Sequence, residues 1–158
     1  MNNMNLKYQQ LLQNCIKYGS SSDGKIGKTK LAKLAYLVDF VYFYYNFESI
    51  TNLEYKKLSE GPVPIEYFQT INFLFESSQI DIKIKGTAQL ISLIEEVETT
   101  ELNKEELDLI IKISQKWKAK NTQSIVEFTH NQLPWKISFD NQKIPYSLIT
   151  QEEERNLY

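Results

Sequence analysis

Residues 31–47 are apolar on every face of a helix, and this run constrains the fold more than any other part of the chain. A helix that is apolar all round must be covered on all sides, by protein or by lipid. The run contains Lys33, Asp39 and four tyrosines, and it is shorter than the roughly 20 apolar residues that cross a bilayer. We therefore predict a helix buried at the centre of a protein core, which starts near Lys30 with Thr29 as its cap, and no membrane segment.

The other helical patterns predict a mainly α-helical fold. Apolar residues at helical spacing indicate further helices around residues 6–16, 67–75, 107–117 and 125–128. Pro64 suits the first turn of the second of these helices, because that position needs no backbone donor. Asn103 and Thr122 are plausible caps of the last two.

A small β element interrupts the helices. Ile80–Lys85 alternates between apolar and polar residues with period two, and Gln89–Val97 can return beside it as the second strand of a hairpin or wing. Glu54–Leu58 is typical of a short extended piece, which ends at Gly61 and the prolines that follow. The predicted fold is therefore mainly α, with a minor β component.

Length and composition fit one compact domain that spans residues 1–158. With 42% hydrophobic and 24% charged residues, the chain can bury a core, which excludes disordered and disulfide-scaffold proteins. Cys15 is the single cysteine, and the polar start of the chain lacks the apolar region of a signal peptide. We expect a cytoplasmic protein. The formal net charge of −2 gives no general attraction to nucleic acid.

Gly27-Lys28-Thr29 resembles the end of a phosphate-binding loop, but the pattern is incomplete. The first glycine of that motif would fall at position 22, which is Ser22, and the preceding segment has the pattern of a helix where the motif needs a strand. We interpret this segment as a flexible connector with lysines that face solvent.

No set of residues predicts a catalytic, metal or cofactor site. His130 lacks the additional ligands or the nucleophile that metal or triad chemistry requires, and Cys15 falls on an apolar helix face. We interpret His130 as a hydrogen-bonding residue that fixes the turn before Pro134 and Trp135, with the tryptophan buried. Asp39 must find donors inside the fold, where it would brace a neighbouring loop; its alternative role is to give specificity at a partner surface.

Function is therefore expected on the surface of the protein. The tyrosines of the central helix, those that face outward, would be good anchors for a protein partner, and the acidic run after the hairpin is a solvated face or a docking patch. The partner-binding candidates are Tyr42, Tyr44, Tyr45, Glu95, Glu96 and Glu98.

An ordered set of short motifs supplies a resemblance. Lys30-Leu31, Lys33-Leu34 and Tyr36 lie on the central helix, and Gly61-Pro62-Val63-Pro64 with Tyr67, Thr129-His130 with Pro134-Trp135, and Ile144-Pro145-Tyr146 follow. In their order and separation, over residues 6–149, they resemble the Panacea domain, also called the SocA-like antitoxin domain, of bacterial and phage-borne toxin–antitoxin pairs. Glu60 departs from the family pattern, which has an aromatic residue there.

The resemblance implies a mostly helical antitoxin that needs no active site. Such a protein neutralises a cognate toxin by direct binding, and some members bring the toxin to a protease. The matching residues, mostly structural, are Leu34, Tyr36, Gly61, Pro62, Val63, Pro64, Tyr67, His130 and Trp135. The alternative function is nucleic-acid binding by a mobile-element protein through Lys25, Lys28, Lys30 and Lys33.

Overall fold

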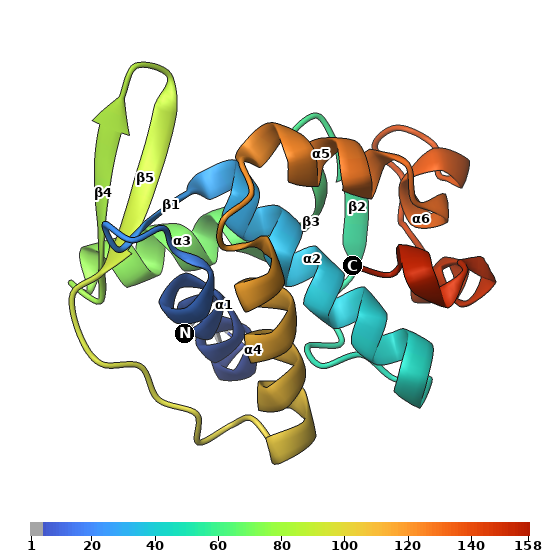
Figure 1. Ribbon diagram of the computed structural model, residues 1–158, viewed down its shortest axis with the longest axis horizontal. Helices are drawn as coiled ribbons and strands as arrows, with labels where there is room; N and C mark the ends of the chain where they lie inside the picture. The colour runs from blue at the N-terminus through green and yellow to red at the C-terminus, as the bar shows by residue number, and fades with distance from the viewer. Residues whose placement is uncertain (1–4) are drawn as a thin grey trace.

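A central helix, α2 (Lys28–Asn46), organises the fold of residues 5–158, the part of the chain that the computed structural model describes. The elements packed against α2 are the helices α1 (Leu6–Gly19), α4 (Lys104–Trp117) and α5 (Thr122–His130), the strands β1 (Lys25–Gly27), β3 (Gly61–Pro64) and β5 (Ala88–Leu93), and the 3-10 segment η1 (Tyr146–Gln151) (Figure 1). Residues 30–42 of α2 are all buried, so the predicted central helix is confirmed. Among the described residues, no helix combines the length and the apolar character that a membrane span requires.

The remaining elements follow in chain order. The helices are α1 (Leu6–Gly19), α3 (Glu66–Glu76), α4 (Lys104–Trp117), α5 (Thr122–His130), α6 (Leu133–Ile137) and two 3-10 segments, η1 (Tyr146–Gln151) and η2 (Glu154–Asn156). The strands are β1 (Lys25–Gly27), β2 (Tyr55–Leu58), β3 (Gly61–Pro64), β4 (Ile80–Lys85) and β5 (Ala88–Leu93). The predicted mainly α fold with a minor β component is confirmed.

Asparagine side chains start three of the helices. Asn5 accepts from the Tyr8 N–H at the start of α1, and Asn121 accepts from the Ser124 N–H at the start of α5. At α4, Asn103 and Glu106 form a reciprocal capping box, as the sequence suggested for Asn103. The prediction of Thr122 as a cap is wrong by one residue, because Asn121, with its short amide, already occupies the non-helical position.

The start of α2 also differs from the prediction. Gly27 is the N-cap, without a side-chain hydrogen bond, and Thr29 already lies in the first turn. The cause is that Lys25–Gly27 is the strand β1, paired with Leu90–Ser92 of β5, rather than a flexible connector. Gly27 leads directly from this strand into the helix, so α2 begins earlier than its apolar run.

The predicted hairpin, β4–β5, is present and is joined by β1 in the order β1-β5-β4. It extends away from the helices at one end of the molecule (Figure 1). Its base is buried, since Ile80 and Ile91 are fully covered, whereas Ile84 near the tip is 78% exposed.

The proline-rich motif forms a strand, which the sequence did not predict. Gly61–Pro64 is β3 and pairs antiparallel with β2, so the prediction that Pro64 opens a helix is wrong; α3 begins at Glu66. Prolines can occupy an edge strand because its outer edge needs no backbone donor. On the other side, β2 exchanges backbone hydrogen bonds with residues 141–144.

Candidate partner-binding site

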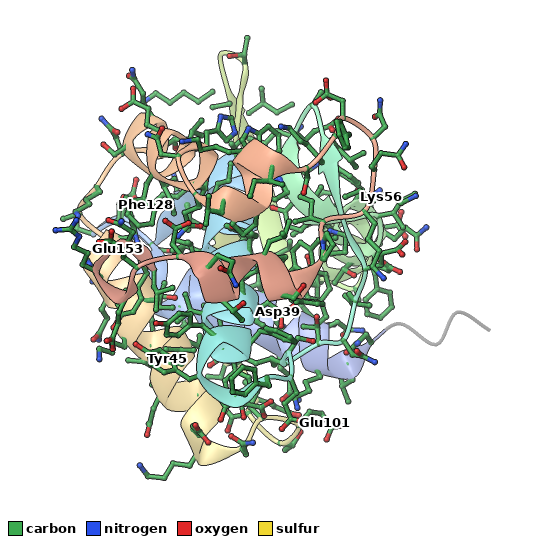
Figure 2. The ribbon with its side chains drawn as sticks, turned by 90° about the vertical axis from the view of Figure 1, so that its right-hand side faces the viewer. Asp39, Tyr45, Lys56, Glu101, Phe128 and Glu153 are labelled. Atoms are coloured by element: carbon green, nitrogen blue, oxygen red, sulfur yellow. The ribbon has the colours of Figure 1, made fainter. Side chains whose placement is uncertain are left out.

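Asp39 anchors the loop that follows α2. Its carboxylate is fully buried, and Oδ1 accepts from the Ile50 and Thr51 N–H groups at 2.8 and 3.2 Å. Oδ2 accepts from the Thr51 hydroxyl at 2.5 Å and from the Tyr55 hydroxyl at 3.0 Å. Figure 2 places Asp39 in the interior, whereas Tyr45 and Glu101 lie at the periphery. These contacts are those of a brace inside the fold, because the carboxylate has no exposed surface to offer a partner.

Burial raises the pKa of the Asp39 carboxyl above its usual range, and the hydrogen bonds from Thr51, Tyr55 and Ile50 oppose that rise. Two effects of opposite sign therefore act on one group. The donors offset part of the desolvation of the carboxylate, which would be far more costly for a buried charge without hydrogen bonds.

Lys33 and Gly61 fit against each other. The Lys33 ammonium, on a side chain that is 2% exposed, donates to the Glu60 carbonyl at 2.9 Å. Gly61 has φ +121, and a Cβ at this position would overlap the end of the Lys33 side chain. Burial lowers the pKa of Lys33 to about 8, which the charge of Glu60 partly opposes. The glycine of the proline-rich motif is thus required by both its backbone angle and its neighbour.

His130 stacks on Trp135. Their rings are parallel, with centroids 4.3 Å apart, and the Lys57 ammonium lies 4.6 Å from the Trp135 ring centroid. Burial lowers the pKa of His130, as do the charges of Lys33 and Lys57. The prediction of a hydrogen-bonding histidine is not supported, because no protein group among the described residues bonds its buried Nε2. The prediction that Trp135 is buried is also wrong: it is half-buried, and Trp117, 3% exposed, takes the place in the core.

The other motif residues are structural in their contacts. Tyr36 is fully buried and donates to Gln132 Oε1 at 2.9 Å, and the Tyr67 hydroxyl donates to the Lys28 carbonyl at 2.6 Å. Leu34, Pro62, Val63, Pro64 and Pro134 are buried. Gln132 was missed by sequence reasoning; its amide also donates to the Asn156 and Leu157 carbonyls, which ties the last residues of the chain to α2. A buried glutamine at a turn gives no periodic signal.

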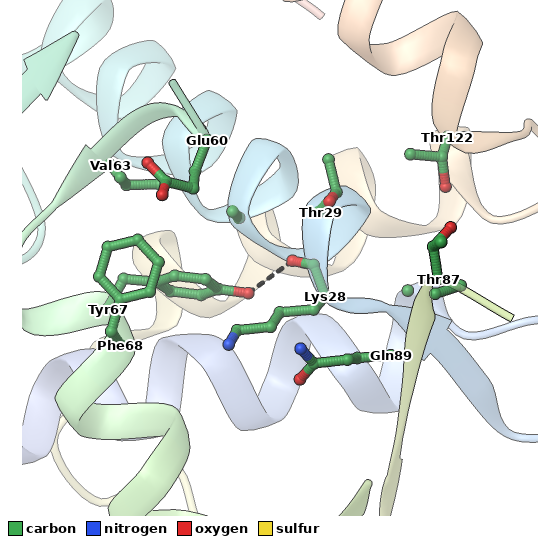
Figure 3. A pocket seen from close by; sticks show the side chains of 12 residues that line it. Lys28, Thr29, Glu60, Val63, Tyr67, Phe68, Thr87, Gln89 and Thr122 are labelled. Atoms are coloured by element: carbon green, nitrogen blue, oxygen red, sulfur yellow. Dashed lines mark hydrogen bonds between the residues drawn. The ribbon is translucent and has the colours of Figure 1, made fainter. Parts of the chain in front are cut away.

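A pocket of about 570 Å³ opens beside the start of α2 (Figure 3). Its walls come from the turn between β2 and β3, from α3 and from the tip of the β4–β5 hairpin, and its size falls within the range of ligand pockets. The Lys28 side chain extends across it, with the ammonium 5.7 Å from the Phe68 ring centroid. Gly27-Lys28-Thr29 lines this pocket, but a phosphate-binding loop would need residues 22–29 as an open loop after a buried strand. Here helix α1 precedes residue 22, and the strand β1 takes up residues 25–27.

A second depression, which we call the tyrosine groove, lies between the C-terminal part of α2 and α4. It has a volume of about 200 Å³ and is lined by Tyr42, Tyr45, Asn46, Glu105, Asp108, Leu109 and Lys112. Tyr42 is only 5% exposed, Tyr44 is half-buried and Tyr45 is 49% exposed. The Tyr45 hydroxyl donates to Glu154 at 3.0 Å. Burial is the main cause that raises the pKa of Tyr45 to about 12, and the Glu154 carboxylate adds to the rise. Of the three tyrosines, Tyr45 is the most exposed, with about half of its surface open to solvent.

The acidic candidates lie elsewhere on the surface. Glu95, Glu96 and Glu98 are exposed in the connection from β5 to α4, which is held against α1 by the bond from Asn14 to the Glu98 carbonyl. None of the three lines the tyrosine groove; its acidic rim is made by Glu105 and Asp108 instead. Sequence order alone could not show this, because it depends on α4, which begins after its N-cap Asn103 and packs against α2.

The lysine-rich start of α2 does not form an open basic surface. Lys30 is 5% exposed and donates to the Lys118 and Lys120 carbonyls at the end of α4, at 3.3 and 2.5 Å. Lys33 is buried against Gly61, as described above. Only Lys25 and Lys28 of the four candidate cations reach solvent, which weakens the case for nucleic-acid binding.

Within residues 5–158, no group of three or more histidine, cysteine, aspartate or glutamate side chains is placed to hold a metal ion. The Cys15 thiol is fully buried, and burial raises its pKa to about 12.

Comparison with known proteins gives one match. A family model described as antitoxin SocA-like, Panacea domain, matches residues 31–136, which is more than half of the 158-residue chain. No curated protein and no solved structure matches the chain at a significant level.

Proposed function

Because the chain belongs to the SocA-like Panacea family of antitoxins, we propose that it neutralises a cognate toxin protein by binding it directly, in the cytoplasm. The family match over residues 31–136 is the observation that carries this proposal. The contacts of the motif residues support this proposal, because most of these side chains bond or pack within the fold and the outer surface is left for a partner.

The tyrosine groove is the surface that we propose for toxin contact. Tyr45 supplies a large ring at its edge, and the buried Tyr42 and the half-buried Leu109 supply an apolar floor. Aromatic anchors inside a polar rim are the usual source of binding energy in protein interfaces. Asp108 on the rim is paired with Lys104 at 2.9 Å and Lys112 also lines the groove, so Glu105 is the acidic group that we propose for the toxin. The complementary segment of the toxin would carry a lysine or arginine that meets Glu105 and covers the Tyr45 ring. Tyr44 would extend this contact, while Glu95, Glu96 and Glu98 are proposed as a separate acidic contact on the connection from β5 to α4.

Co-expression tests the function itself. Each reading frame that neighbours the gene is expressed alone and together with this protein, and growth is measured. We expect one frame to be toxic alone and harmless in the pair, with the two proteins co-purifying. If no neighbour is toxic, or if the protein neither binds nor rescues, the antitoxin proposal fails. Toxin levels in protease-deficient cells then distinguish blocking from delivery to a protease, because only delivery requires the protease.

Two variants test the groove. Tyr45→Ala and Glu105→Lys are expected to weaken toxin binding about tenfold or more, or at least about 1.4 kcal/mol. The first variant removes the aromatic anchor, and the second sets a positive charge against the cation of the toxin. Phe75→Ala is the matched control, because Phe75 has a similar exposure of 46% but lies on α3. Binding is measured by calorimetry on folded variants. If all three variants bind the toxin as tightly as the unmodified protein does, the contact lies outside the groove. Rescue in co-expression would still support the antitoxin function in that case.

A further inference from the structure

The outer edge of β4 is unpaired. Its six residues pair with β5 along one edge only, because β4 is the last strand of the sheet. Within residues 5–158, no backbone hydrogen bond from another element reaches the other edge. Figure 1 shows β4 as the outermost strand of a hairpin that extends from the body of the molecule. An exposed edge of this kind is a template for a further strand.

The charged residues of β4 also lack partners. Asp81, Lys83 and Lys85 share one face, and the residues opposite them on β5 are Ser92, Leu90 and Ala88. No ion pair of these three side chains occurs among the described residues. The strand β4 therefore carries both a negative and two positive side chains on one face, and the residues opposite them on β5 are uncharged.

We propose that β4 pairs antiparallel with β4 of a second copy of this chain, about a two-fold axis at Ile82. This register places Asp81 opposite the second copy's Lys83, and Lys83 opposite the second copy's Asp81. A two-fold axis normal to the sheet keeps each side chain on its own face, so both ion pairs form on the charged face. Opposite charges directly across two strands contribute about 0.2–1 kcal/mol per pair.

The apolar face fits the same register. Ile82, which is half-buried, lies opposite the second copy's Ile82. Ile84, 78% exposed in the single chain, lies opposite the second copy's Ile80, which is already buried in its own chain, so Ile84 gains cover mainly from the added strand. An axis at Lys83 is less favourable, because it sets two lysines directly against each other. Pairing at Ile82 joins two three-stranded sheets into one of six strands. One pair of edge strands buries less area than a standard interface, so the dimer is weak and concentration-dependent.

A charge-exchange experiment tests the register. Asp81→Lys makes both charges beside the axis positive, and Lys83→Asp makes both negative, so each variant alone sets like charges against each other. We expect sedimentation equilibrium to show a dimer for the unmodified protein and dimerisation at least about tenfold weaker for each variant. An equimolar mixture of the two variants forms a heterodimer, and the double variant D81K/K83D regains the homodimer.

The controls of the dimer experiment, and the results that would contradict the dimer, do not depend on toxin binding. Asp81 is only half-buried and Lys83 is exposed, so both variants keep their fold, which thermal unfolding verifies. Lys143→Asp, at an exposed lysine outside the hairpin, leaves dimerisation unchanged. The proposal is overturned if the unmodified protein stays monomeric at the highest concentration, or if the single variants dimerise as well as it does. Neither result depends on a toxin, so the antitoxin function is judged independently.

Discussion

Gly61 and Lys33 depend on each other, because the space beside the glycine is taken by the end of the lysine side chain. The backbone angle of +121° at Gly61 is one that residues with a Cβ rarely adopt. The lysine cannot move freely, since it is buried and bonded to the Glu60 carbonyl. Gly61 is therefore needed for its turn conformation and also because Lys33 occupies the space where a Cβ would lie.

Gly61→Ala is expected to lower the free energy of unfolding by about 2 kcal/mol or more, from backbone strain plus crowding at Lys33. Denaturant titration measures the loss. Gly86→Ala is the matched control, because Gly86 also has positive φ (+63°) but nothing lies within 4 Å of its Cβ position. We expect a loss of only about 1 kcal/mol there. Equal losses at the two sites would show that Lys33 plays no part.

Lys33 predicts a pH dependence of stability. Its pKa is about 8 in the folded protein and near 10.5 when unfolded, because burial penalises the charge. Between these values the unfolded chain holds more protons, so the free energy of unfolding attributable to Lys33 rises with pH. Lys33→Met should remove this rise, measured as the difference between the two proteins from pH 8 to 10.5. Lys143→Met, at an exposed lysine, should retain it; an unchanged slope in Lys33→Met would contradict the assignment.

At the scale of elements, Asp39 couples α2 to the loop after it. Asp39→Ala would leave the Ile50 and Thr51 N–H groups and the Tyr55 hydroxyl without their acceptor. We expect a loss of about 3 kcal/mol or more in denaturant titration. Asp39→Asn should cost less, because its oxygen still accepts and the hydroxyl groups can turn. Similar losses for both variants would mean that side-chain volume matters more than hydrogen bonding.

The elements show where sequence reasoning succeeds. The apolar run of α2, the alternation of β4 and the cap at Asn103 are local signals, and each predicted its element. Errors came where pairing with another strand decides the local structure. Lys25–Gly27 is a strand only because β5 lies beside it, and Pro64 is extended only because it pairs with Tyr55.

At the scale of the whole molecule, the motif residues and the proposed contact residues occupy different regions. The motif residues lie in α2, in β3, at the start of α3 and around the turn before α6, and most of them are buried. The sequence could not show which tyrosines face solvent, because α2 is apolar all round and carries no polar stripe. It also could not show that Glu105, rather than Glu95, lies beside Tyr45, since that depends on how α4 packs against α2.

The burial of Cys15 gives the chain a built-in reporter of global opening. Its thiol, with a pKa of about 12, reacts with alkylating reagents only when α1 separates from the core. Pulsed alkylation therefore counts molecules that have opened, without any added dye. A cysteine introduced by Ser22→Cys, at an exposed turn, can be labelled with a fluorophore in the folded protein while Cys15 remains unlabelled.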